Sequence, residues 1–217
     1  MEIKYGSQVK IDHLTKRKSI DLFIFSENHE KRAFSLYAKL QKSNNILKTV
    51  AFCYKQSIVE QKVDAINKIL ITESTEIYKF LDEELEKINS EEITLVIDYS
   101  CMTKPWYYSI VLYLKNRESN LKKICAYFSY TPSKFNEPKA PKPNKEIGPL
   151  PGKYIVPTDK PKALIVCLGY EQNKAEGIIE HLDPKVSYIF YTNPASEKKF
   201  VQTLENNNKS ILKERVE

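Results

Sequence analysis

Glycine is scarce in this 217-residue chain, where five glycines stand against eleven prolines. The sequence contains neither the G-x-x-x-x-G-K-[S/T] string of a P-loop nor the G-x-G-x-x-G string of a dinucleotide-binding turn. A nucleotide site built on a glycine-rich loop is therefore excluded, and a phosphate contact would need other groups.

Cysteine, histidine and long apolar runs are also in short supply. The four cysteines form no C-x-x-C pair and have no histidine at zinc-ligand spacing, which is typical of reduced core thiols and argues against disulfides and structural zinc. No apolar run approaches the roughly 20 residues of a membrane span, and the N-terminal stretch lacks an apolar signal core. We therefore expect a cytoplasmic protein without a membrane partner.

The net charge of +6 comes from 34 basic and 28 acidic residues. Half of it lies in one segment, because residues 132–161 hold six lysines and three acidic residues. The charge therefore gives only weak support to a nucleic-acid partner.

Short runs rich in β-branched and aromatic residues alternate with segments of helical spacing, which is the pattern of βα units and a parallel sheet. In the first part of the chain the predicted strands are 20–26, 48–54, 92–99 and 123–129, and the predicted helices include 58–70 and 75–88. The runs IDLFIFS and TLVID are apolar without alternation, as in strands buried on both faces. The sequence thus predicts an α/β fold of Rossmann-like three-layer architecture with a mostly parallel sheet.

Eight of the eleven prolines lie between residues 131 and 161, where they alternate with lysine and favour extended backbone. We expect three parts: a core at 1–131, a Pro/Lys-rich arm or linker at 132–161, and a βαβα segment at 162–217. The last segment has two predicted strands, 163–168 and 186–191, too few for a core of its own. It should complete the first sheet or start a second lobe. The arm is the expected contact for a partner protein or a second copy.

The turn at residues 98–104, DYSCMTK, carries the richest set of polar side chains at the end of a predicted strand, where parallel α/β sheets bind ligands. Asp98, Ser100, Thr103 and Lys104 could hold an anion or orient a sugar hydroxyl at the start of the next helix. The same residues could instead serve the fold, with Ser100 and Thr103 as caps, Asp98 as an acceptor for turn amides and Lys104 in solvent.

Two other turns follow predicted strands. In SENHEKR, Glu30 beside His29 could take part in acid–base chemistry, or it could belong to the exposed first turn of a helix. In the second, Gly169 could allow close backbone approach, and Tyr170 and Glu171 could contact a ligand.

The sequence does not identify a cofactor. Asp98 with Glu30 or Glu171 could bind Mg²⁺ if their carboxylates converge. A Cys101–His29 nucleophile pair is a further alternative, although the glycines of a nucleophile elbow are missing. The tyrosines and the tryptophan of residues 106–113 have the helical spacing of core residues more than that of a stacking platform for nucleic acid.

Residues 97–114, IDYSCMTKPWYYSIVLYL, resemble the Asp-x-Ser-x-Met-Ser/Thr-Arg/Lys strand-to-helix segment of poorly characterised Rossmann-like proteins from prokaryotic anti-phage defence loci. The HEKR and GYE turns extend the resemblance to about 60 of the 217 positions. It implies a cytoplasmic bacterial defence component with a nucleotide-type pocket at the strand ends, formed by Glu30, Asp98, Ser100, Thr103, Lys104 and Glu171. Lys104 stands where arginine is usual, which weakens bidentate recognition of a phosphate.

Two hypotheses follow from the sequence. In the first, the protein belongs to a bacterial anti-phage defence system and binds a nucleotide-derived molecule at this pocket, with Asp98 and Glu30 as the catalytic pair if the molecule is hydrolysed. Ser100, Thr103, Lys104, Tyr170 and Glu171 would then be the ligand-binding residues. In the second, it is a non-catalytic interaction module for a partner effector protein or nucleic acid. Convergence of these side chains in one pocket would favour the first hypothesis.

Overall fold

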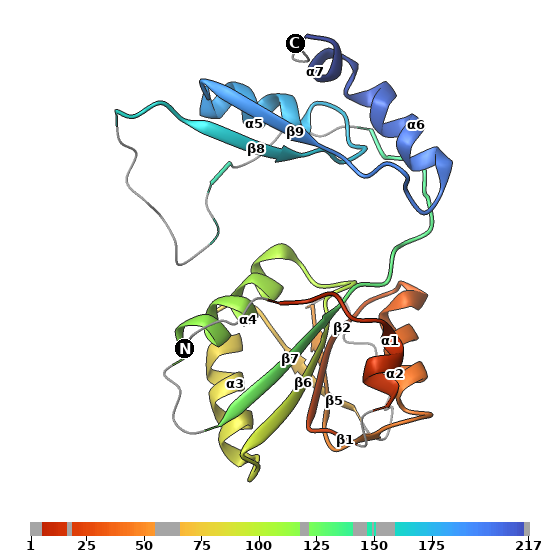
Figure 1. The fold of residues 1–217 in the computed structure, drawn as a ribbon, viewed down its shortest axis with the longest axis vertical. Helices are drawn as coiled ribbons and strands as arrows, with labels where there is room; N and C mark the ends of the chain where they lie inside the picture. The colour runs from red at the N-terminus through yellow and green to blue at the C-terminus, as the bar shows by residue number, and fades with distance from the viewer. Residues whose placement is uncertain are drawn as a thin grey trace. The chain divides into compact units, whose positions relative to one another are not determined.

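The computed structural model of the chain describes residues 6–16, 19–54, 66–117, 122–140, 147–148, 150 and 159–214. The chain divides into two compact units, Met1–Thr131 and Pro132–Glu217 (Figure 1). Every strand pair in these described ranges is parallel.

The first unit is built on a five-stranded sheet with the order β5-β4-β2-β6-β7. Its strands are β2 (Leu22–Glu27), β4 (Thr49–Cys53), β5 (Ile66–Leu70), β6 (Glu92–Asp98) and β7 (Lys123–Ser129). A short pair, β1 (Ser19–Ile20) and β3 (Asn45–Ile46), forms a separate small sheet. Counted along the chain within the large sheet, the order is 3-2-1-4-5, as in a Rossmann-like fold. The predicted α/β class is confirmed.

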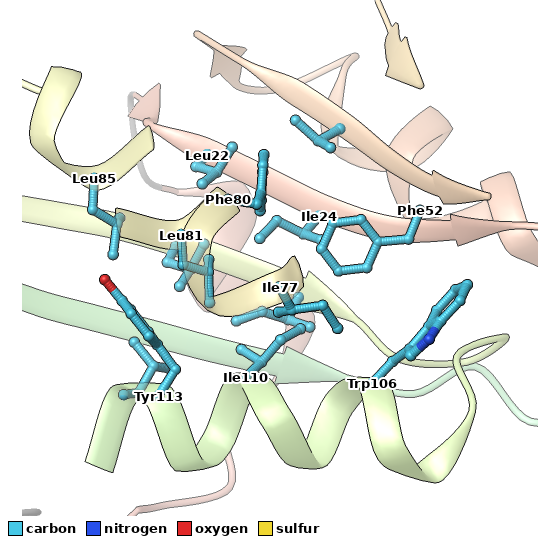
Figure 2. Packing of buried hydrophobic residues seen from close by; sticks show 14 of the residues in the cluster. Leu22, Ile24, Phe52, Ile77, Phe80, Leu81, Leu85, Trp106, Ile110 and Tyr113 are labelled. Carbon is cyan, nitrogen blue, oxygen red and sulfur yellow. The ribbon is translucent and has the colours of Figure 1, made fainter. Parts of the chain in front are cut away.

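Helices cover both faces of this sheet (Figure 1). On one face lie α1 (Ile11–Thr15), the 3-10 helix η1 (Lys31–Phe34) and α2 (Ser35–Leu40), and on the other lie α3 (Glu76–Lys87) and α4 (Lys104–Asn116). Alternate residues of β2 serve the two faces, since Phe23 and Phe25 belong to the α2 cluster, and Leu22 and Ile24 to the α3–α4 cluster. Figure 2 shows the α3–α4 cluster. Two cores on one sheet make the three layers.

The prediction of a helix over residues 58–70 is wrong where it can be compared. Ile66–Leu70 forms β5, which pairs with β4, and residues 58–65 lie outside the described part of the chain. β5 is an edge strand whose residues are only half-buried or exposed. An edge strand needs no continuous apolar run, so INKIL does not show the signal by which the central strands were predicted.

The second unit contains a two-stranded sheet of β8 (Ala163–Cys167) and β9 (Val186–Phe190), with α5 (Lys174–Leu182), α6 (Lys198–Asn207) and α7 (Lys209–Glu214). The expectation that this segment has too few strands for a core of its own is wrong, because helices α5, α6 and α7 supply apolar residues as well. The core is small and consists of Val166, Leu168, Ala175, Ile179, Leu204 and Ile211. In the described part of the chain β8 and β9 do not join the five-stranded sheet. Of all the described helices, none is long and apolar enough to cross a membrane.

The predicted arm begins with residues 132–140, which contain no helix or strand. Phe135 nevertheless packs in the second unit, where its ring lies 5.1 Å from that of Phe200 and 6.2 Å from that of Tyr170. Its N–H donates a hydrogen bond to Glu197 Oε1 at 2.8 Å. Phe135 is therefore half-buried, and this part of the predicted arm packs within the second unit. Residues 141–146, 149 and 151–158 of the arm lie outside the described part.

We expect trypsin to cut the native chain first within residues 132–161. Lys134 and Lys139 are exposed and lie in a segment without helix or strand, so a protease can bind there without unfolding a core. Mass mapping of the earliest fragments locates the cut. A first cut inside residues 20–130 would contradict this prediction.

Candidate functional site

The centre of the large sheet is its topological switch point, because the chain leaves β2 towards η1 and α2 on one face and leaves β6 towards α4 on the other. Open α/β sheets bind ligands beyond the strand ends at such a point. β2 and β6 are direct neighbours, and their register places Phe25 beside Asp98. The turns that follow the two strands therefore begin side by side at the same edge of the sheet.

Asp98 is the last residue of β6 and is 1% exposed. Its Oδ1 atom accepts hydrogen bonds from the N–H of Ser100, at 3.0 Å, and from the Ser100 hydroxyl. Its Oδ2 atom is buried and has no hydrogen-bond partner among the described residues. Burial raises the pKa of this carboxyl above its ordinary value, although the two Ser100 bonds and the charge of Arg32 oppose the rise. The site thus contains a buried acceptor with one oxygen unused.

Glu30 follows β2 and forms a two-point ion pair with Arg32. Arg32 Nε lies 2.7 Å from Glu30 Oε2, and Arg32 Nη2 lies 3.3 Å from Glu30 Oε1. The hydrogen bond from Arg32 lowers the pKa of Glu30, and the backbone N–H of Glu30 donates to Asn28 Oδ1 at 2.7 Å. A carboxylate held in this way is an orienting partner for the guanidinium and is poorly suited to exchange protons near neutral pH.

Thr131, the last residue of the first unit, connects the two groups. Its N–H donates to Ser100 Oγ at 2.7 Å, and its carbonyl oxygen accepts from Arg32 Nη1 at 2.8 Å. The Arg32 guanidinium also lies over the ring of Tyr130, 5.6 Å from the ring centre. The Asp98–Ser100 pair therefore holds the backbone N–H of Thr131, and the Glu30–Arg32 pair holds its carbonyl.

The start of α4 offers an anion fewer N–H groups than the sequence suggests. The N–H of Thr103 donates to the Tyr54 hydroxyl at 3.1 Å, Pro105 has no N–H, and the N–H of Trp106 donates to the Thr103 carbonyl at 3.1 Å. The Thr103 side chain makes no capping bond, so the alternative in which Thr103 caps the helix is wrong, and its ligand-binding role stays a prediction. The Thr103 and Lys104 side chains are exposed.

Tyr170 and Glu171 belong to the second unit, in the turn after β8. Tyr170 packs its ring 5.5 Å from that of Phe200, and its carbonyl oxygen accepts from Asn207 Nδ2 at 2.7 Å, whereas Glu171 is exposed. A Cβ atom at Gly169 would meet nothing within 4 Å, so packing does not require glycine there. The ligand-binding roles of Tyr170 and Glu171 stay predictions.

Of the predicted site residues, the structure thus brings together Glu30, Asp98 and Ser100, through Arg32 and Thr131. Sequence reasoning missed Arg32 and Thr131, although Arg32 lies in the same turn as Glu30 and Thr131 follows the fourth predicted strand. Their roles depend on contacts between residues 99 positions apart in the chain.

Cys101 is half-buried, and burial raises the pKa of its thiol, which weighs against the Cys101–His29 nucleophile alternative. Within the ranges that the structure describes, no three His, Cys, Asp or Glu side chains are grouped to hold a metal ion. The core role of the residue 106–113 aromatics is confirmed for Trp106 and Tyr113, which belong to the α3–α4 cluster.

Among the described residues, two of the cavities that lie away from the switch point contain paired polar side chains. One, of about 400 Å³, is at the amino ends of the strands, where Lys48 and Lys87 both pair with Glu84. The other, of about 530 Å³, lies between α3 and α4 and contains the hydrogen bond from the Tyr113 hydroxyl to Asp82. Arg117 lines the second cavity, and its buried Nη1 atom, like Asp98 Oδ2, has no hydrogen-bond partner among the described residues. We place the candidate site at the switch point because the buried Asp98 carboxyl lies there at the carboxyl ends of the strands, where open α/β sheets bind ligands.

The strand order and this polar cluster define a Rossmann-like α/β unit with a candidate binding site at its switch point. No family model matches the chain, and neither a curated protein nor a solved structure is significantly similar to it.

Proposed function

We propose that the first unit binds a nucleotide-type ligand at the switch point between β2 and β6, as a component of a bacterial anti-phage defence system. The observation that supports binding is the buried Asp98 carboxyl, whose Oδ2 atom has no partner among the described residues. A ligand hydroxyl such as that of a ribose would satisfy it, which would remove the cost of a buried acceptor without a hydrogen bond. The defence role rests on the resemblance of residues 97–114.

Arg32 supplies the positive charge that such a ligand needs. Its side chain is only 18% exposed, and its guanidinium is oriented by Glu30, so it is preorganised to meet a phosphate. Of the two predicted catalytic acids, only Asp98 has a raised pKa, whereas that of Glu30 is lowered. The geometry therefore gives more support to binding of a ligand than to its hydrolysis.

A thermal-shift screen tests this function. The full chain is heated with NAD, ATP, GTP or cyclic nucleotides, each with and without Mg²⁺, because a ligand selective for the folded state raises the melting temperature. We expect at least one of these compounds to stabilise the wild type and to leave the Asp98→Asn variant unchanged. The absence of a shift with every compound would overturn the proposal.

Lys104 provides a separate prediction. If an anionic group lies near the start of α4, Lys104→Ala should weaken binding by ~0.3–1 kcal/mol, roughly two- to fivefold in Kd, because the charge is exposed. Lys104→Glu should weaken it further through repulsion. Lys115→Ala, at an exposed lysine in the last turn of the same helix, is the matched control. Titration calorimetry measures Kd, and equal effects at the two lysines would remove Lys104 from the site.

A second candidate function is the interaction module, and one observation favours it. One face of the β8–β9 sheet is apolar and uncovered, with Ile165 69%, Tyr188 55% and Phe190 56% exposed. Exposed apolar patches of this kind mark surfaces that bind other molecules. If this function is correct, Ile165→Lys should abolish cellular activity without lowering the melting temperature, whereas Lys160→Glu, at an exposed position, should not.

A further inference from the structure

We propose that ligand binding at the switch point releases the end of the first unit, because a ligand bound by Asp98 and Arg32 weakens the hydrogen bonds by which Ser100 and Arg32 hold the backbone of Thr131. The inference rests on the proposed function and concerns the regulation of that same site. It follows from one observation: the side chains that would bind the ligand are those that hold Thr131.

The first contact is a chain of two hydrogen bonds. The N–H of Thr131 donates to Ser100 Oγ at 2.7 Å, and the Ser100 hydroxyl donates its single proton to Asp98 Oδ1. Ser100 is 6% exposed, so its side chain, which joins these two hydrogen bonds, is shielded from water. A ligand hydroxyl that donates to Asp98 Oδ2 draws on the charge of the same carboxyl and so weakens the bond from Ser100 to Oδ1. A Ser100 side chain that reorients no longer holds the Thr131 amide in the same place.

The second contact involves Arg32, whose three guanidinium nitrogens are all engaged. Nε and Nη2 donate to the Glu30 carboxylate, and Nη1 donates to the Thr131 carbonyl. The bonds to Glu30 join two charged groups, whereas the Thr131 carbonyl is a neutral acceptor and therefore the weaker partner. A phosphate that approaches Arg32 would thus displace Thr131 before it displaces Glu30.

Release of Thr131 affects the segment that joins the two units. Thr131 is anchored in the first unit, and Phe135 is anchored in the second by Glu197, Tyr170 and Phe200. Three residues, 132–134, separate the two anchors. Loss of the anchor at Thr131 lengthens the unanchored segment towards β7. Ligand binding would therefore make this segment more flexible.

The hold on Thr131 is tested first without a ligand. Amide exchange of Thr131 in the 15N-labelled full chain is followed by NMR. Ser100→Ala should speed it about tenfold, because it removes the acceptor of the Thr131 N–H, and Arg32→Ala about threefold, because it removes the bond to the Thr131 carbonyl and loosens the residue indirectly. Lys31→Ala, at the exposed basic residue next to Arg32, should leave it unchanged. Unchanged exchange in both site variants would overturn the inference.

The coupling is then tested with ATP and inorganic phosphate as probes, with Arg32 Nε–Hε and Thr131 N–H followed in the same spectra. A probe that shifts the Arg32 signal and speeds Thr131 exchange severalfold supports the inference. A probe that shifts the Arg32 signal and leaves Thr131 exchange unchanged overturns it while the proposed binding function stands. If neither probe shifts the Arg32 signal, and the thermal-shift screen is also negative, the proposed function fails and the coupling fails with it.

Discussion

Replacement of Asp98 by asparagine is expected to weaken nucleotide binding strongly and to leave the first unit folded. Asparagine keeps an oxygen that can accept the two bonds from Ser100, and it places an N–H donor where Oδ2 now lacks a partner. A ligand hydroxyl that must donate a proton at this position then meets a donor. Titration calorimetry with the compound found by the thermal-shift screen should show a loss of about ten- to a hundredfold in affinity, as for a hydrogen bond to a charged group.

The stability of the Asp98→Asn variant follows from the pKa. Burial raises the pKa of Asp98 in the folded chain above the ordinary value of 3.8, so the folded state favours the protonated form. The carboxyl therefore lowers the free energy of unfolding as the pH rises from the unfolded pKa through the folded one. At neutral pH the asparagine variant should melt no lower than the wild type, and at a pH below 3.8 the difference should vanish.

Two controls complete the Asp98 experiment. Asp82→Asn removes a carboxylate on α3 that accepts a hydrogen bond from the Tyr113 hydroxyl on α4, away from the switch point, and should leave binding intact. Asp98→Ala removes both Ser100 bonds and should lose about 1–3 kcal/mol of stability as well as binding. Full binding by the asparagine variant would show that Asp98 serves only the turn.

The central strands could be predicted because a strand buried on both faces has a continuous run of apolar residues in the sequence. β2 and β6 each place five or more consecutive residues in the core, so IDLFIFS and TLVID are apolar without alternation. Ile66–Leu70 has no continuous apolar run, because as an edge strand it pairs with only one neighbouring strand. Its residues satisfy helical spacing equally well, and only pairing with Thr49–Cys53 makes it a strand.

In the candidate site, too, some residues could be predicted from the sequence and others could not. Asp98 and Ser100 could be selected because their hydrogen bond spans two residues at the end of a strong strand signal. Arg32 and Thr131 could not, because their contact exists only once β2 and β6 are neighbours and β7 lies beside β6. That order is a property of the whole sheet, and no local pattern near either residue encodes it.

Trp106 links the core to the candidate site. It is 6% exposed and lies in the first turn of α4, where its ring stacks on that of Tyr54 at 4.2 Å and meets Phe52 edge-on at 6.0 Å. The Tyr54 hydroxyl donates to the Cys101 carbonyl at 3.0 Å and accepts from the N–H of Thr103. The packed ring of Trp106 therefore holds the tyrosine that fixes the turn between β6 and α4.

Trp106→Ala should lower the free energy of unfolding of the first unit by about 3–5 kcal/mol, because it removes a buried aromatic side chain from a packed cluster and leaves a cavity. It should also weaken ligand binding, since Tyr54 loses the ring that positions it against residues 101–103. Urea unfolding followed by circular dichroism measures the first effect, and calorimetry measures the second. Trp106→Phe, which keeps a ring for Tyr54 to stack on, should recover most of the binding and part of the stability. Equal losses of stability in the alanine and phenylalanine variants would show that the stacked contact is not what holds this turn.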